Sequence, residues 1–263
     1  MPSFDRLWPA SSPGSVDVTP AAQPSNPHEQ APIITMRIWQ VPTSHIPMAL
    51  ANMGWGRVAL RRAHGVTFAK LLGTGSGQTF TVTDADVHHW ALLSVSQTTR
   101  GAAALGRSRL IRSWNDMASE TLQVELRTLS SRGRWSGHEP FPSGRPHSWD
   151  GPVAANTRAR IKPASWRTFW SAVPPVAADL RGRAGVLLTL GIGEAPIGWQ
   201  GTFSIWEHNR ALTEFAQRGA AHRQAITETA RQDWYAEELF ARFAVLKCIG
   251  TFAGAAVLPA EAS

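Results

Sequence analysis

Nine histidines and one cysteine are the side chains of this chain that could bind a transition metal or a metal cofactor. They form no compact motif, because no two histidines have the His-x-x-His spacing and no Asp or Glu stands two residues after a histidine. The single Cys248 excludes both an intramolecular disulfide and a cysteine-rich metal site. A non-haem iron site with two histidines and a carboxylate would therefore need distant residues that converge in the fold.

A glycine-rich stretch, Gly73-Thr-Gly75-Ser-Gly77, follows a predicted strand and invites comparison with phosphate-binding loops. The segment after it, 78–86, is strand-like or irregular instead of helical, so the helix N-terminus that would bind a phosphate is missing from the pattern. Neither the Gly-x-Ser-x-Gly nucleophile motif nor the zinc motif His-Glu-x-x-His occurs. We interpret the stretch as a tight turn, and hydrolytic functions lose support.

The elements that must position these residues are predicted by an internal repeat. The segment Phe68-Ala-Lys-Leu-Leu-Gly73-Thr-Gly75 is echoed, 118 residues later, by Val186-Leu-Leu-Thr-Leu-Gly191-Ile-Gly193. The same offset places Glu120 on Glu238, next to a predicted strand in each half. A repeat of this length is larger than a solenoid unit and indicates a duplicated module.

Each half shows the pattern β-α-β-β-α-β, which is the ferredoxin-like arrangement. Alternation and β-branched residues predict the strands, and 3.6-residue periodicity predicts the helices. In the first half we expect strands over 33–41, 66–72, 87–95 and 121–129, with helices over 45–62 and 98–119. In the second half we expect strands over 153–161, 186–190, 199–206 and 239–246, with helices over 165–181 and 209–233.

We therefore predict an α+β protein in which two duplicated ferredoxin-like modules, 33–137 and 153–248, form an intrachain α+β barrel of the dimeric α+β barrel type. A Pro- and Gly-rich linker over 138–152 joins them. Residues 1–32, rich in Pro, Ser and Ala, are expected to be a disordered leader, and 249–263 a loosely packed or disordered tail. The two sheets are expected to enclose an apolar chamber large enough for a porphyrin or a long hydrocarbon.

Composition gives weaker indications of partners. The net charge of +7 favours negatively charged partners without choosing among nucleic acid, an anionic membrane surface and cofactor carboxylates. The arginines are dispersed, which argues against nucleic acid. Twelve Trp beside a single Tyr either fill the core or line a pocket for a large apolar ligand. No export signal or membrane-crossing apolar run is evident, so a cytoplasmic protein, with peripheral contact to a membrane at most, is expected.

Five short motifs of the chain are specific only in combination. They are Ser131-Arg-Gly-Arg-Trp-Ser-Gly with Pro140-Phe141, Pro152-Val-Ala-Ala-Asn-Thr-Arg158-Ala, Gly191-Ile-Gly193-Glu194-Ala-Pro196, Thr202-Phe-Ser-Ile-Trp206 and Trp234-Tyr-Ala-Glu-Glu238-Leu-Phe-Ala-Arg242-Phe. Together they resemble the spheroidene monooxygenase family of carotenoid-modifying enzymes, and the resemblance runs from residue 33 to about 252. The resemblance implies a monooxygenase that inserts oxygen from O2 into a carotenoid methylene to give a ketone, with haem as an associated cofactor.

A haem enzyme needs an axial ligand and partners for the propionates. His222, in the predicted helix of the second half, is the candidate iron ligand, with an exposed helix histidine as the alternative. His88 is placed across the pocket, or as the ligand itself, although a histidine at a strand entrance is the simpler interpretation. Arg158 is the candidate propionate anchor and catalytic residue. Glu194 is expected either to hold a ligand His or an Arg in place or to cap the turn after the Gly-x-Gly motif. Arg132 and Arg134 are further propionate candidates, or parts of a solvated basic linker.

The substrate channel is expected to be walled by Trp90, Phe203 and Trp206. Cys248 could supply a thiolate ligand, but it lacks the Phe-x-x-Gly-x-x-x-Cys surroundings, and packing is the simpler interpretation. Electrons are expected from an external reductase or ferredoxin, because no flavin or nicotinamide fingerprint is present. The alternatives are a non-catalytic barrel that binds haem or an apolar ligand, and another haem-barrel enzyme of the peroxidase or dehydratase type.

Overall fold

In the computed structural model, the described part of the chain comprises residues 32–75, 85–142, 148–162, 183–194, 199–218 and 235–258, with the side chains of 199–200 and 217–218 left aside. All of these residues belong to one unit, Ala31–Ser263.

The first half has four strands and two helical connections, as the sequence pattern predicts. Its elements are β1 (Ile33–Gln40), the short 3-10 helix η2 (Thr43–His45), α1 (Ile46–Arg61), β2 (Val66–Gly75), β3 (Ala85–Ser96), α2 (Thr99–Gly106), α3 (Arg109–Met117) and β4 (Glu120–Gly133). The predicted helix over 98–119 is two helices. The Ser108 hydroxyl accepts the N–H of Ile111 at 3.3 Å and so caps a new helix just after Gly106.

The second half repeats the order of strands. Its described elements are β5 (Val153–Ile161), β6 (Val186–Gly193), β7 (Trp199–Trp206), α5 (Asn209–Arg218), β8 (Tyr235–Phe252) and the two-residue β9 (Ala255–Ala256). The strands predicted over 153–161 and 199–206 have the predicted bounds. The predicted helix over 165–181 lies outside the described residues, as does the part of the second helix beyond 218.

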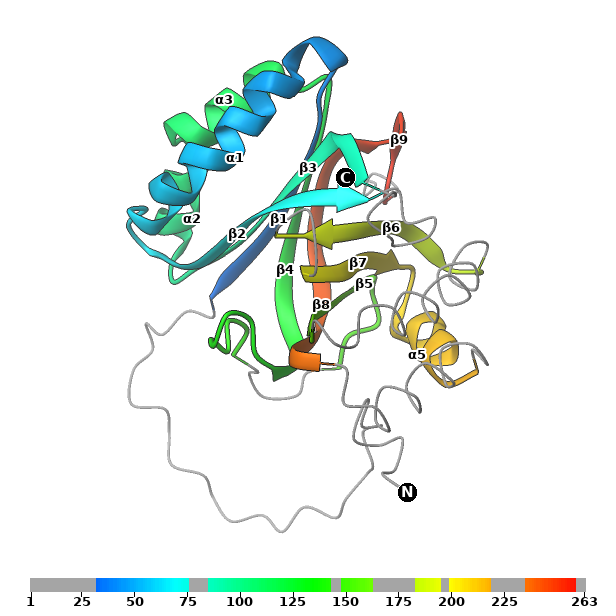
Figure 1. Cartoon of the computed structure of the whole chain (residues 1–263). Coiled ribbons are helices and arrows are strands. Elements are labelled where there is room, and N and C mark those ends of the chain that lie inside the picture. The colour runs from blue at the N-terminus through cyan, green and yellow to red at the C-terminus, as the bar shows by residue number, and fades with distance from the viewer. Residues whose placement is uncertain are drawn as a thin grey trace. The chain divides into compact units, whose positions relative to one another are not determined.

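All neighbouring strands are antiparallel, and their order is β4-β1-β3-β2-β6-β7-β5-β8-β9 with an additional β4–β8 pairing. The strands β1 to β8 therefore form a closed ring (Figure 1). Within each half the order is the same, β4-β1-β3-β2 and β8-β5-β7-β6, which confirms the duplicated ferredoxin-like arrangement.

The two copies of the repeated glycine motif form one seam of this ring. Gly73 pairs with Gly193 and Gly75 with Gly191, so β2 and β6 meet through equivalent residues. The other seam is the long pairing of β4 with β8, from Leu122 opposite Gly250 to Gly133 opposite Leu239. Equivalent strands thus pair with each other at both seams, which is the pattern of a two-fold relationship between the halves.

The β4–β8 seam also corrects the prediction for the C-terminal end. The strand expected over 239–246 runs from Tyr235 to Phe252, into the segment expected to be a tail, because it pairs along the length of β4. Gly133 (φ 89°) and Gly250 (φ 98°) lie near the two ends of the seam. A Cβ at either position would overlap a carbonyl oxygen of the opposite strand, that of Glu238 or of Thr121.

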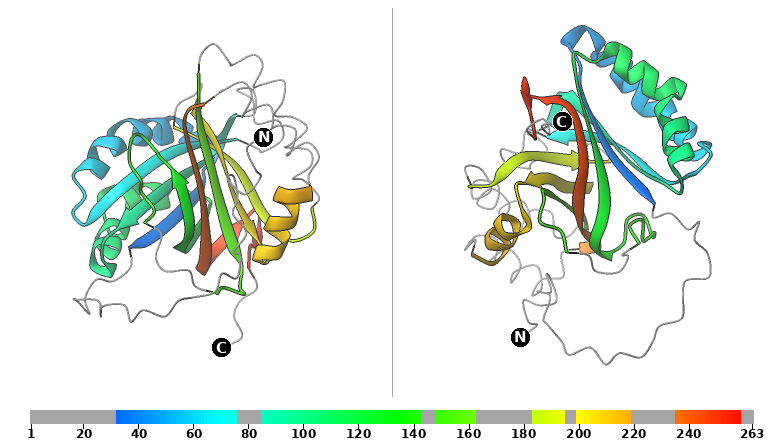
Figure 2. Two further views of the ribbon diagram at one scale, coloured as in Figure 1. Left: turned by 90° about the horizontal axis from the view of Figure 1, so that it is seen from below. Right: turned by 180° about the vertical axis from the view of Figure 1, so that it is seen from behind.

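Alternation along the strands gives each half two faces. On the outer face of the first half, Trp39, Trp90 and Leu92 pack with helical residues, including Trp114, whose ring stacks on Trp39 at 5.1 Å. The helices α1, α2 and α3 cover this face, and α5 contacts β7 of the second half (Figures 1 and 2).

The inner face of the ring is a packed core in the described part of the chain, and not the open chamber that we expected. Apolar side chains from both halves form one buried cluster there. Its large members, such as Met36, Trp135, Phe203 and Phe243, expose at most 2% of their surface. Side chains that line a ligand-sized cavity would expose more surface to it, so the expectation of a chamber between the sheets is wrong at these positions.

Candidate functional site

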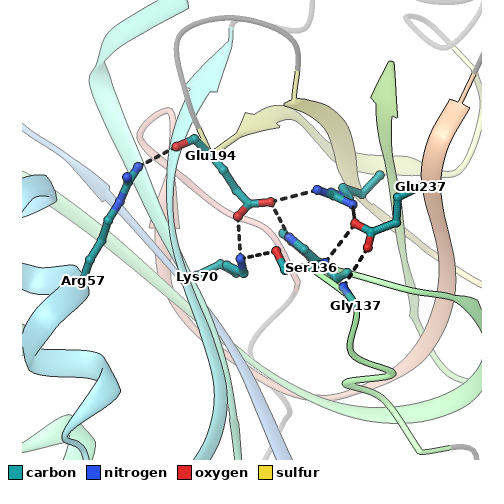
Figure 3. Close-up of polar contacts among 8 residues, drawn as sticks. Arg57, Lys70, Ser136, Gly137, Glu194 and Glu237 are labelled. Atoms are coloured by element: carbon teal, nitrogen blue, oxygen red, sulfur yellow. Dashed lines mark hydrogen bonds and ion pairs between the residues drawn. The ribbon is translucent and has the colours of Figure 1, made fainter. Parts of the chain in front are cut away.

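Four charged side chains from four separate segments meet on the inner side of the ring, and we call them the four-charge cluster (Figure 3). Lys70 comes from β2, Arg158 from β5 and Glu237 from β8, while Glu194 directly follows β6. Glu194 is the central acceptor: its Oε2 lies 2.6 Å from Lys70 Nζ and its Oε1 lies 3.2 Å from Arg158 Nη2. Arg158 Nη1 in turn pairs with Glu237 Oε1.

The connection after β4 completes the cluster. The N–H groups of Ser136 and Gly137 donate to the two carboxylate oxygens of Glu237, at 2.9 and 2.7 Å. The indole of Trp135 donates its N–H to Glu194 Oε1, and its ring lies 5.6 Å from the Arg158 guanidinium carbon. Trp135 is fully buried and packs edge-on against Phe68 of β2 at 5.5 Å. The connection is therefore fixed by charge and by apolar packing together.

The cluster is electrically balanced, with two cations facing two carboxylates. Burial raises the pKa of Glu237, but hydrogen bonds from Gly137, Ser136 and Arg158 together hold that pKa below its ordinary value. Arg158 exposes only 3% of its side chain and is already shared between two carboxylates. Such an arrangement can lock the two halves of the chain together, and it offers no surplus charge to a ligand.

The structure thus brings together two predicted site residues, Arg158 and Glu194, and Glu194 does hold an arginine in place. Lys70, Trp135 and Glu237 are residues that sequence reasoning did not assign to the site. Four of the five motif segments that carry the family resemblance meet here, in the regions of 131–137, 152–159, 191–194 and 235–242. Trp135 and Glu237 lie within these motifs, so their membership of the motifs is the sequence signal that could have pointed to them.

A second cluster of polar side chains lies on the outer face of the second half. Arg132 is directly opposite Phe240 across the β4–β8 seam, and Arg242 follows on the same face of β8. The Arg132 guanidinium lies over the Phe240 ring at 5.1 Å, and Arg242 donates from Nη1 to Asn209 Oδ1 at the start of α5, at 2.5 Å. Burial lowers the pKa of Arg242 to about 10. Two guanidinium groups therefore lie on the same face of the sheet, and that of Arg242 contacts the start of α5.

Buried polar atoms without a hydrogen-bond partner occur on this outer face. They include Nε and Nη2 of Arg132, and Thr189 Oγ1 on β6. A buried guanidinium nitrogen that lacks an acceptor is costly, and a carboxylate oxygen is its natural partner. The donor set on this face therefore suits an anionic ligand group better than the four-charge cluster does.

The adjacent histidines of β3 have opposite orientations, and the inward one is not the one we expected. His88 lies on the outer side with Trp90, and its Nδ1 is 2.9 Å from the Val41 carbonyl oxygen. His89 lies on the inner side, where Nδ1 is 2.6 Å from Asp86 Oδ2 and the ring is 5.4 Å from Phe252. His89 Nε2 is buried without a partner. The hydrogen bond from His89 lowers the pKa of Asp86.

Comparison with known proteins places this chain. It is 35% identical to spheroidene monooxygenase of Rhodobacter capsulatus over 215 residues, which cover 81% of this chain and 89% of that protein. It is 36% identical to the Rubrivivax gelatinosus spheroidene monooxygenase over 72% of this chain and 73% of that protein. The chain belongs to the spheroidene monooxygenase family. The chain is therefore a monooxygenase by enzyme class.

Spheroidene monooxygenase of Cereibacter sphaeroides is 35% identical over 78% of this chain, and the chain spans 64% of that relative's length. No protein-family model matches. Among solved structures, an aldoxime dehydratase is similar with a TM-score of 0.58 at 10% identity, covering 89% of each chain. The aldoxime dehydratase OxdRE is similar with a TM-score of 0.52 at 12% identity, over 81% of this chain and 79% of that one. These two likenesses concern the fold alone.

The three aromatic residues expected to wall the channel of this spheroidene monooxygenase family member do not lie together. Trp90 belongs to the outer core of the first half, and its indole N–H donates to Val87 O. Phe203 is in the inner core. Trp206 is on the outer side of the second half, where its ring lies 5.4 Å from Phe215 of α5. Of the three, Trp206 lies on the same outer face as Arg242 and packs against α5, the helix that begins at Asn209.

Two ligand candidates remain, His222 and Cys248. His222 lies outside the described residues. Cys248 is half-buried against the inner core, and burial raises the pKa of its thiol, which opposes a thiolate at neutral pH. Within the described ranges, no three His, Cys, Asp or Glu residues are grouped so that they could hold a metal ion. None of the described helices is long and apolar enough to cross a membrane.

Proposed function

We propose that this chain inserts one oxygen atom from O2 into spheroidene or a similar long, apolar carotenoid. The observation that carries this proposal is the identity of 35% to the Rhodobacter capsulatus enzyme over 89% of that enzyme's length. The proposal concerns the substrate and its product, a ketone formed at a methylene group by two successive insertions. The first insertion gives an alcohol, and the second gives a geminal diol that loses water to leave the ketone. A carotenoid has no charged group, so its recognition would depend on apolar contacts.

Haem is the proposed redox group, since no ordinary side chain binds O2 and passes electrons to it. When bound, haem would supply the redox chemistry that the activation of O2 requires. The outer face of the second half has the donors that its two propionates would need, because Arg132 has two buried N–H groups without acceptors and Arg242 lies on the same face. His222 remains our proposed axial ligand.

The contacts of Arg158 change its proposed part in this arrangement. Its guanidinium is engaged by Glu194 and Glu237, so we assign the propionate partner to Arg132 instead. Arg158 would act as a positioning residue that fixes the connection containing Trp135, three residues beyond Arg132. Trp206 and Phe215 would contribute apolar surface beside the cofactor and help to exclude water.

Electrons would come from a separate reductase or ferredoxin. A monooxygenase reduces the second oxygen atom of O2 to water, which requires two electrons and two protons for each atom inserted. The chain shows no flavin or nicotinamide fingerprint that could supply them from within.

The decisive experiment supplies the haem-reconstituted full chain with a reductase system, a carotenoid and isotopically heavy O2. We expect a ketone that contains the heavy oxygen atom and no product without O2. Product that forms without O2, or only with added peroxide, would replace the proposal by a dehydratase-type or peroxidase-type activity. Haem binding without any turnover would favour the non-catalytic binder.

The axial ligand is tested separately by the absorption spectrum. His222→Ala should shift or abolish the Soret band, while His64→Ala, which removes an exposed histidine of the first half, should leave it unchanged. An unchanged spectrum in His222→Ala would remove His222 as the ligand.

A further inference from the structure

The outer surface of α1 is unusual because its first three turns carry no charge. No Asp, Glu, Lys or Arg occurs from Ile46 to Gly56. Four large apolar side chains of this helix are substantially exposed: Met48 by 54%, Leu50 by 56%, Trp55 by 39% and Val58 by 48%. A helix on a protein surface normally places polar residues on its outer face, so this exposed apolar set is a candidate contact surface.

These four side chains are not needed to pack α1 against its own sheet. The buried side of the helix is formed by other residues, Ala49, Asn52, Gly56 and Leu60. Gly56 is in close contact with Leu71 of β2 and Leu110 of α3, which brings the helix close to both. Folding of the first half therefore does not explain why these four exposed residues are apolar.

The same layer is strongly basic. Seven exposed arginines belong to α1, α2, α3 and their C-terminal caps, against the single acidic residue Asp116. They are Arg57, whose Nη2 also donates to the Glu194 carbonyl oxygen at 2.6 Å, and Arg61, Arg62, Arg100, Arg107, Arg109 and Arg112. Figure 1 shows the three helices together on one side of β1, β2 and β3. The chemical complement of such a surface is an apolar layer bordered by negative charge.

A groove next to the exposed apolar residues adds a specific feature. It has a volume of about 350 Å³ and lies between the start of α1 and α3. Its lining contains Met48, the guanidinium groups of Arg109 and Arg112, His45 and the carboxylate of Asp116. A phosphate group in this groove would meet two positive charges against one negative charge, beside an apolar side chain that can enter a lipid layer.

We propose that the α1–α3 layer is a docking surface for an anionic lipid bilayer. Met48, Leu50, Trp55 and Val58 enter the boundary between head groups and acyl chains, and the arginines of the same layer bind lipid phosphates. The inference extends the proposed function, since a carotenoid substrate is dissolved in lipid, but docking is measurable without turnover. Peripheral docking keeps the enzyme at the membrane in which the substrate is dissolved, without requiring a membrane-crossing helix.

A second copy of the chain fits this surface less well. A two-fold symmetric contact would place seven exposed arginines against the same seven of the partner, with one Asp116 on each side. The like charges would oppose association, whereas an anionic bilayer neutralises them.

The test is sedimentation of the full chain with vesicles of phosphatidylcholine, with and without phosphatidylglycerol. We expect binding to the anionic vesicles, little binding to the neutral ones, and weakening by salt. Leu50→Ser with Val58→Ser should lower the partition coefficient at least about tenfold. Arg61→Gln with Arg62→Gln should lower it by a similar factor.

Matched controls come from exposed residues elsewhere. Leu246→Ser with Ile249→Ser removes two aliphatic side chains of similar exposure, 45% and 48%, from β8. Arg134→Gln with Arg210→Gln removes two exposed charges outside the layer. Both controls should bind anionic vesicles as the unchanged protein does.

Failure of the unchanged protein to bind anionic vesicles would overturn the docking proposal, as would equal losses in the controls. If the unchanged protein is a dimer without vesicles and the Leu50→Ser, Val58→Ser variant is a monomer, the surface is a protein interface instead. If vesicle binding is as expected but no carotenoid is oxidised in detergent, the proposed function fails while the docking surface stands.

Discussion

Arg158 and Glu237 form an ion pair between adjacent strands, with the arginine almost fully buried on the inner side of the ring. The pair joins the connection after β4 to the second half, because Glu237 also accepts the N–H groups of Ser136 and Gly137. Removing one member of a buried pair leaves the other charge without compensation, which costs more than the pair itself contributes.

Arg158→Met is therefore expected to lower the free energy of unfolding by about 3 kcal/mol, as measured by urea denaturation. The double variant Arg158→Met, Glu237→Gln should lose less than the sum of the two single variants, because the two residues interact directly. Arg210→Ala, which breaks the exposed pair with Glu214, is the control and should cost about 0.5 kcal/mol or less. A similar loss in both arginine variants would contradict the importance of the cluster.

The pH dependence of stability should report on Glu237. Although burial raises its pKa, hydrogen bonds from Gly137, Ser136 and Arg158 hold that pKa below the ordinary value of about 4.3. The folded protein therefore binds this proton less readily than the unfolded chain, and Glu237 stabilises the fold above its unfolded pKa. This stabilisation is lost as the pH falls through the folded pKa.

Denaturation curves between about pH 6 and pH 3 should thus show a shallower acid-induced loss of stability in Glu237→Gln than in the unchanged protein. Glu139→Gln, at an exposed carboxylate, should keep the original slope. An unchanged slope in Glu237→Gln would show that the hydrogen bonds of this carboxylate do not depress its pKa.

The glycines at the ends of the β4–β8 seam should resist substitution. Gly133→Ala and Gly250→Ala combine a left-handed backbone with an overlap between the new Cβ and a carbonyl oxygen, so each should destabilise the protein by at least about 2 kcal/mol. Gly54→Ala is the matched control in α1, where a Cβ meets no atom within 4 Å. It should stabilise the helix by about 0.5–1 kcal/mol in thermal or urea unfolding.

Arg132 should be required to retain haem. Arg132→Gln removes the guanidinium whose Nε and Nη2 are buried without acceptors, and haem titration should show an affinity reduced by about tenfold or more. Arg134→Gln, two residues away and exposed, should bind haem as the unchanged protein does. Equal affinities for the two variants would move the proposed propionate partner away from Arg132.

The sequence alone determined the repeat, the class of fold and most of the strands. Hydrophobic alternation is a local property, and for β5 and β7 it predicted both ends of the strand. It could not predict where β8 ends, because the length of that strand depends on pairing with β4, more than a hundred residues earlier. The repeated Gly-x-Gly motif was visible in the sequence, but only the fold shows that its two copies pair with each other.

Only the tertiary structure decided which side chains share a site. β3 is buried on both faces, so alternation could separate His88 from His89 without telling which one points inward. The four-charge cluster joins Lys70 to Glu237 through residues distributed over the whole folded unit, and no local spacing announces such a convergence. The sizes of the side chains that meet inside the ring depend on all the strands together, which is why its interior is a packed core where a chamber was expected.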